Sequence, residues 1–159
     1  MSVVFLSLGS NQQRLKNLRF AINELTAEFG DLVKSNTYKN TAVGFSGNDF
    51  YNLVVKLETD YSVLELNDFL KKLESSAGRD HSMAKFSGRT LDVDILLFDD
   101  LVLHPEFDIP RNEIMIYSFV LQPLSEIAPN LKHPISQLTM LELWQGFDQT
   151  AKLTNIIEL

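Results

Sequence analysis

The order of extended and helical patterns along the first hundred residues constrains the fold of this chain more than any other feature. Apolar runs at 3–8, 32–38, 50–57 and 90–98 indicate strands, and apolar residues at helical spacing follow the first and third runs. The order is therefore strand, helix, strand, strand, helix, strand. This is the split βαβ order of a ferredoxin-like βαββαβ fold. We predict an α+β protein with helices packed on an antiparallel sheet.

Local signals predict where the helices begin. Glu65 follows Ser62 at the spacing of a capping box, and Asn11 is placed to cap the first helix. Two further helices are expected around 119–127 and 137–145. These would be extra C-terminal helices outside the six-element core.

Composition limits the organisation and the classes of function. The length of 159 residues, 45% of them hydrophobic, fits a single domain over 1–159. A net charge of −7 argues against nucleic-acid binding, because a phosphate backbone needs a basic surface. The apolar run 1–8 is too short to span a membrane, so we expect no membrane association. The sequence has no cysteine, which excludes thiolate chemistry and fits a cytoplasmic protein.

Two aspartates occupy alternate positions in the last strand of the core. A strand has a side-chain period of two, so Asp92 and Asp94 should share a face, about 7 Å apart. The same geometry should turn their apolar neighbours to the opposite face: Leu91, Val93, Ile95 and Leu97. Paired carboxylates suit Mg²⁺ that also binds substrate phosphates. Two solvent-facing aspartates near a strand start are the simpler alternative, and the pattern alone leaves both open.

Basic residues gather beside this acidic strand: Lys71, Lys72, Arg79, Lys85 and Arg89. Cations next to carboxylates suggest a polyphosphate ligand, because the cations would bind phosphate oxygens while the carboxylates hold the metal. Arg79 and Arg89 are the stronger candidates. The lysines fit a solvated charged loop equally well.

An aromatic and an amide share one face of the third strand. Phe50 could stack on a flat heterocycle while Asn52 hydrogen-bonds its ring nitrogens. A core phenylalanine and a turn-side asparagine are the ordinary alternative. The sequence has no Walker motif, so any nucleotide site here is not a P-loop.

These residues together resemble the 6-hydroxymethyl-7,8-dihydropterin pyrophosphokinase family. Arg89–Phe98 matches the family signature R-x-L-D-x-D-I-L-L-(F/Y). Other similar segments are Gly9–Asn11, Tyr38–Gly44, Asp49–Asn52, Glu74 followed by Gly78 and Arg79, and Phe119–Pro129. The resemblance runs nearly end to end. It implies an enzyme of folate biosynthesis that transfers pyrophosphate from ATP to a pterin alcohol and releases AMP.

The resemblance also implies roles for individual residues. Asp92 and Asp94 would coordinate two Mg²⁺ ions, and Arg79 and Arg89 would act with them as catalytic residues at the phosphates. The remaining ATP contacts would be Glu74, Ile95 and Arg111. The pterin contacts would be Asn40, Val43, Phe50, Asn52, Phe86 and Phe119, with the two rings of Phe50 and Phe119 sandwiching the pterin. The partners would be the two small-molecule substrates, and we expect a monomer.

Two positions depart from the family pattern. Arg111 stands where the family has histidine, and Tyr117 stands where it has arginine. In the family both positions belong to the nucleotide-binding residues. Arg111 can return a cation to this place, whereas Tyr117 cannot supply charge. The alternative to an active enzyme is therefore a divergent homologue that binds pterin or nucleotide with weak or no turnover.

Overall fold

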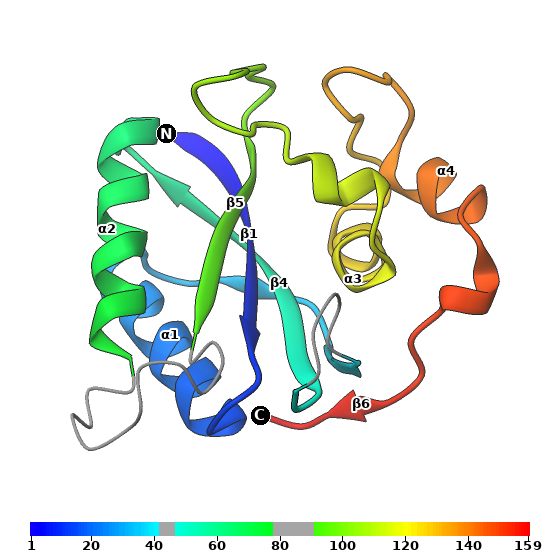
Figure 1. The fold of residues 1–159 in the computed structure, drawn as a ribbon. Helices are drawn as coiled ribbons and strands as arrows, with labels where there is room; N and C mark the ends of the chain where they lie inside the picture. The colour runs from blue at the N-terminus through cyan, green and yellow to red at the C-terminus, as the bar shows by residue number, and fades with distance from the viewer. Residues whose placement is uncertain (42–46, 78–90) are drawn as a thin grey trace.

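The computed structural model describes residues 1–41, 47–77 and 91–159, and its centre is one antiparallel sheet (Figure 1). The strands are β1 (Ser2–Ser10), β2 (Val33–Lys34), β3 (Thr37–Asn40), β4 (Phe50–Thr59), β5 (Asp92–Phe98) and β6 (Ile156–Ile157). Their order is β5-β1-β4-β3-β6, and β2 also pairs with β4. With β2 and β3 counted as one strand, this is the order expected for a ferredoxin-like sheet. The predicted α+β fold is confirmed.

The predicted second strand is divided in two at Ser35. The Ser35 hydroxyl accepts the Val54 backbone N–H at 2.9 Å, and the Ser35 N–H donates to the Val54 carbonyl at 2.9 Å. A side chain thus replaces one backbone group in the ladder, which separates β2 from β3. Strand β6, whose two residues pair with Thr37 and Tyr38 of β3, was not predicted.

Two helices cover one face of the sheet, α1 (Arg14–Phe29) and α2 (Val63–Ser76) (Figure 1). The predicted capping box is present, because the Ser62 hydroxyl accepts the Glu65 N–H and the Glu65 carboxylate accepts the Ser62 N–H. The predicted Asn11 cap is wrong. The residue before α1 is Gln13, at a φ of 45°, and Asn11 is buried two residues earlier.

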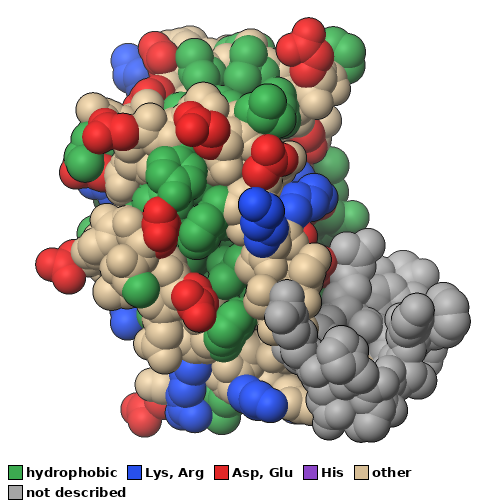
Figure 2. Space-filling view, turned by 90° about the vertical axis from the view of Figure 1, so that its left-hand side faces the viewer, with side chains coloured by type: hydrophobic (Ala, Val, Ile, Leu, Met, Phe, Trp, Pro, Cys, Tyr) green, Lys and Arg blue, Asp and Glu red, His purple; other side chains and the backbone are tan. Residues whose placement is uncertain are grey.

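Figure 2 views the molecule from the side on which α2 lies. Acidic side chains are spread over this face with apolar side chains between them, and the basic side chains form small groups. No helix among the described residues is long and apolar enough to cross a membrane.

The other face of the sheet is covered over only part of its length. The helices α3 (Ser118–Ile127) and α4 (Met140–Gln145) build a second apolar core there (Figure 1). Sheet residues in this core are Phe5, Val54, Leu96 and Leu97. Further along the same face, towards the start of β5, the side chains are polar and line a pocket.

A bulge in β5 corrects one prediction about this strand. Leu6 lies opposite Ile95 and Phe5 lies opposite Leu97, so Leu96 is an extra residue with no partner residue on β1 in the register. Val93 and Ile95 pack under α1 and α2 as predicted, but Leu97 packs with Leu96 in the second core. The expectation that Leu97 points away from the aspartate face is wrong, because the bulge interrupts the alternation.

Candidate active site

The polar part of the sheet is the floor of a pocket of about 400 Å³. Strands β1, β3, β4 and β5, the segment before α3 and the first turn of α3 contribute its lining: Ser7, Gly9, Asn40, Phe50, Asn52, Asp92, Asp94, Arg111, Glu113, Tyr117 and Phe119. Six of the residues singled out from the sequence therefore meet in one place, together with Arg111. We call this the first pocket.

Asp92 and Asp94 both face the first pocket, as their spacing predicted. In the register of the sheet they lie opposite Gly9 and Ser7 of β1, whose small size leaves room above the floor. Among the described residues, no group of three or more acidic, histidine or cysteine side chains could hold a metal alone. Two carboxylates without a third protein ligand fit Mg²⁺, which completes its shell with water and phosphate oxygens.

Asn52 lies on the floor of the first pocket and is held from two sides. Its side-chain nitrogen donates to the side-chain oxygen of Asn40 on β3. On the β1 side it lies opposite Gly9, and a β-carbon there would meet the Asn52 oxygen. Phe50, two residues before Asn52, lines the same pocket, whereas Tyr51 packs into the α1 and α2 core. The predicted shared face of Phe50 and Asn52 is confirmed.

The opposite wall of the first pocket is aromatic. Phe119 lies in the first turn of α3, and the ring of Tyr117 stacks on it with centroids 4.9 Å apart and an interplanar angle of 16°. The wall therefore has two stacked rings. An arginine at position 117 could not complete an aromatic pair of this kind.

A second, smaller pocket of about 120 Å³ adjoins the first one. Its lining comes from α2, β5 and the segment that follows β5: Asn67, Leu70, Lys71, Glu74, Val93, Asp94, Ile95, Phe107, Asp108, Ile109 and Arg111. Asp94 and Arg111 line both pockets. The predicted nucleotide contacts Glu74 and Ile95 belong to the second pocket, beside the acidic pair.

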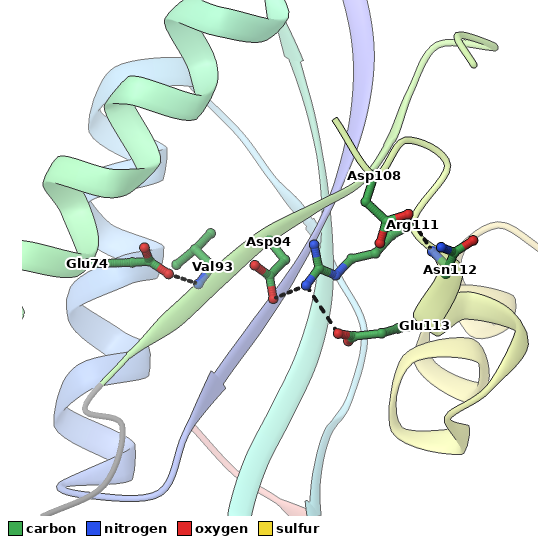
Figure 3. A network of polar contacts seen from close by, with 7 residues as sticks. All are labelled: Glu74, Val93, Asp94, Asp108, Arg111, Asn112 and Glu113. Carbon is green, nitrogen blue, oxygen red and sulfur yellow. Dashed lines mark hydrogen bonds and ion pairs between the residues drawn. The ribbon is translucent and has the colours of Figure 1, made fainter. Parts of the chain in front are cut away.

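Glu74 joins α2 to the acidic strand. Its carboxylate accepts the backbone N–H of Val93, the residue between the two aspartates, at 2.9 Å (Figure 3). Burial raises the pKa of Glu74, the Val93 hydrogen bond opposes this, and the nearby charges of Asp92 and Asp94 add to the increase. This contact fixes the start of β5 against the helix.

Arg111 lines both pockets, and its guanidinium points to the carboxylates of Asp94 and Glu113 (Figure 3). Its Nη2 lies 3.1 Å from Glu113 Oε1 and 3.5 Å from Asp94 Oδ2. Burial would lower the pKa of Arg111, but the charges of Asp94 and Glu113 outweigh it and raise the pKa. The guanidinium therefore stays charged beside the carboxylates.

Some predicted residues cannot be placed, and others were not predicted. Arg79, Arg89, Val43 and Phe86 lie outside the described residues. Ser7, Gly9 and Glu113 line the first pocket although no role was predicted for them, and Tyr117 lines it as well, although it was noted only as a departure from the family's nucleotide contacts. For Ser7 and Gly9 a signal existed, because small residues at alternate positions of a strand leave space on one face.

Comparisons with known proteins agree on one family. The family model described as 7,8-dihydro-6-hydroxymethylpterin-pyrophosphokinase matches residues 5–129. The 2-amino-4-hydroxy-6-hydroxymethyldihydropteridine pyrophosphokinase of Aquifex aeolicus is 36% identical over 146 residues, which is 89% of this chain and 90% of that protein. The protein of the same name from Haemophilus influenzae is 33% identical over 144 residues, covering 87% of this chain and 89% of the relative.

A solved structure has the same fold. The wild-type HPPK-DHPS of Plasmodium falciparum superposes with a TM-score of 0.70 at 15% sequence identity. The match covers 91% of this chain but only 44% of the Plasmodium chain, so this chain spans less than half of that protein. At this identity the likeness concerns the fold alone.

Proposed function

Since this chain belongs to the 7,8-dihydro-6-hydroxymethylpterin-pyrophosphokinase family, we propose that its two adjoining pockets bind the two substrates of pyrophosphate transfer. The activity is transfer of pyrophosphate from ATP to hydroxymethyldihydropterin in folate synthesis. The finer assignment gives the first pocket to the pterin and the second to the nucleoside. The phosphates then lie between them, at Asp94 and Arg111.

One observation carries this assignment: Asp94 and Arg111 line both pockets. A phosphate chain that reaches from the second pocket to the first must pass a carboxylate and a guanidinium. Such a pair suits a metal-bound polyphosphate, because each charge meets the opposite one on the ligand. Arg79 and Arg89 complete the set of cations in this proposal.

The metal is proposed to be Mg²⁺, as two ions held by Asp92 and Asp94 together with the phosphate oxygens. When bound, Mg²⁺ would neutralise phosphate charge and orient the chain for in-line attack. The two protein ligands come from one rigid strand, so their spacing is fixed before the substrate arrives. Glu74 supports them by fixing the backbone between them.

The pterin is proposed to lie between Phe50 and Phe119, with Asn52 and Asn40 hydrogen-bonding its edge. Asn52 is 5% exposed and already held by Asn40, so its amide is presented in one orientation. Val43 and Phe86 are included as further pterin contacts. The pterin hydroxymethyl oxygen would form a bond to the β-phosphorus while the bond to the AMP oxygen breaks.

Three wider assignments belong to the proposal. Residues 1–159 act as a single domain, the enzyme is a monomer, and it works in the cytoplasm. The absence of cysteine supports the last of these, because a reducing compartment offers no gain from disulfides. Light scattering during gel filtration would test the monomer, and an elution as a dimer would contradict it.

The test of the activity is AMP release from Mg-ATP with and without 6-hydroxymethyl-7,8-dihydropterin. We expect AMP to form only when both the pterin and Mg²⁺ are present, and EDTA to stop it. Pterin binding without any AMP would instead favour the divergent binding homologue.

A further inference from the structure

Glu113 faces the phosphate region although nothing in the sequence singled it out. It belongs to a short 3₁₀ helix, η1 (Asn112–Met115), between β5 and α3. Its carboxylate lines the first pocket with Asp92 and Asp94. Three acidic side chains therefore share this pocket with Arg111.

Arg111 contacts two of these acids through one nitrogen atom. Nη2 donates a hydrogen bond to Glu113 at 3.1 Å, while the same nitrogen lies 3.5 Å from Asp94 as an ion pair (Figure 3). Glu113 is thus the nearer partner. A guanidinium that lost Glu113 would have Asp94 as the next carboxylate within reach.

The backbone allows Arg111 little freedom other than a turn of its side chain. Its N–H donates to the Leu96 carbonyl of β5 at 2.9 Å, and its carbonyl accepts the Ile114 N–H at 3.1 Å. On the other side, the Asn112 N–H donates to Asp108 at 3.1 Å. Which carboxylate the guanidinium contacts therefore depends only on the side-chain torsions of Arg111.

We propose that Glu113 is a positioning residue that shares the Arg111 guanidinium with Asp94 and keeps the Arg111–Asp94 ion pair at its longer distance of 3.5 Å, so that Arg111 competes less with Mg²⁺ for this carboxylate. The inference rests on the proposed function, in which Asp94 is a metal ligand and Arg111 a phosphate contact. The buried Nε of Arg111 has no hydrogen-bond partner among the described residues. While Glu113 holds Nη2, the fork still has donors for a phosphate oxygen.

The experiment is calorimetric binding of α,β-methylene ATP at increasing Mg²⁺ concentration. The proteins are the unmodified chain, Glu113→Gln, Arg111→Ala and the double variant. We expect Glu113→Gln to raise the Mg²⁺ concentration for half-maximal binding by about three- to tenfold, because Arg111 then moves closer to Asp94 and pairs with it alone. In the Arg111→Ala background the same change should have no effect. Glu113→Asp, which keeps the charge, should restore most of the difference.

The double variant separates this role from a direct effect of charge. If the Glu113 charge acted on Mg²⁺ directly, Glu113→Gln would raise the required Mg²⁺ concentration by the same factor with and without Arg111. That result would overturn the proposal. An unchanged Mg²⁺ dependence in Glu113→Gln would do so as well. The melting temperature of Glu113→Gln should match that of the unmodified protein, since Glu113 is a partly exposed side chain. If Glu113→Gln does not fold, Glu113→Ser replaces it in the same cycle.

The outcome is distinguishable from failure of the proposed function. The variants could show coupling between Glu113 and Arg111 in nucleotide binding while no AMP forms from ATP and pterin. This result would contradict the proposed activity but support the role of Glu113. AMP formation without this coupling would do the reverse. No Mg²⁺-dependent binding of the analogue to the unmodified chain would overturn both.

Discussion

Gly9 and Asn52 lie opposite each other in the β1–β4 register, and a β-carbon at Gly9 would lie 2.5 Å from the Asn52 side-chain oxygen. Carbon and oxygen atoms do not approach so closely without a bond. The Asn52 amide therefore keeps its place in the pocket because residue 9 has no side chain.

We expect Gly9→Ala to weaken pterin binding by displacing the Asn52 amide. The loss of a buried hydrogen bond, worth about 1 to 3 kcal/mol, corresponds to roughly a five- to 150-fold higher Kd. Quenching of pterin fluorescence would measure it. The matched control is Gly146→Ala, where the nearest atom to the new β-carbon lies at an ordinary 3.6 Å and pterin binding should not change. Equal affinity in Gly9→Ala would refute the role of Asn52.

Asp94→Ala should abolish Mg²⁺-dependent turnover while the fold is retained. We expect the turnover rate to fall at least about a thousandfold, because the Mg²⁺ that neutralises the phosphate charge would lose one of its two protein ligands. The Asp94 side chain is 35% exposed, so its removal leaves little cavity. AMP formation and circular dichroism are the measurements. Asp100→Ala, an exposed acid just after β5, is the control and should stay active; an active Asp94→Ala enzyme would contradict the metal assignment.

Tyr117→Arg should raise the affinity for ATP, alone or together with Arg111→His. The change restores a cation beside the first pocket where the family carries one, and we expect an increase of about three- to tenfold. Tyr117→Phe keeps the stack on Phe119 and is the matched control, with unchanged ATP binding. If neither Tyr117→Arg nor the double change alters ATP affinity, positions 111 and 117 no longer contribute to nucleotide binding in this protein. That result would contradict the prediction.

His133 should make the protein less stable in mild acid. The side chain is 5% exposed, its Nδ1 accepts the Ile135 and Ser136 N–H groups, and burial lowers its pKa below the usual 6.5. Below pH 6.5 the unfolded chain binds the proton more readily than the folded one, so the free energy of unfolding falls as the pH falls.

The size of this effect is bounded by one proton, about 1.4 kcal/mol per pH unit. Urea unfolding at pH 7.5 and 5.5 would measure it. His133→Asn keeps an acceptor but does not titrate, so it should lose less stability between the two pH values than the unmodified protein. The same loss in both would mean that other groups set the acid sensitivity.

Periodicity within single segments predicted much of the fold. The strand order followed from the sequence of extended and helical segments, whereas the shared faces of Asp92 with Asp94 and of Phe50 with Asn52 depend on alternation that each strand carries by itself. The division at Ser35 and the bulge at Leu96 depend on hydrogen bonds with neighbouring strands, which alternation does not contain. The failed Asn11 cap has a similar cause, since the burial of Asn11 is a tertiary effect.

The part of the site between β5 and α3 was the least predictable. Arg111 and Tyr117 were noticed only through a family resemblance, and Glu113 was not noticed at all. This segment has no regular period, and its side chains meet the acidic strand because the Arg111 N–H bonds to Leu96. Such a contact joins residues that are distant in the sequence, so residue patterns do not reveal it.

The extra residue in β5 has a consequence for comparing relatives. Before Leu96 the odd-numbered residues point towards α1 and α2, and after it Phe98 does so instead. Removing Leu96 or Leu97 would restore strict alternation and leave the aspartates and Phe98 on their present faces, because these two consecutive leucines share one face. A one-residue gap at 95–97 of an alignment therefore leaves both carboxylates facing the pocket, whereas a gap at Val93 would put the two aspartates on opposite faces of the sheet.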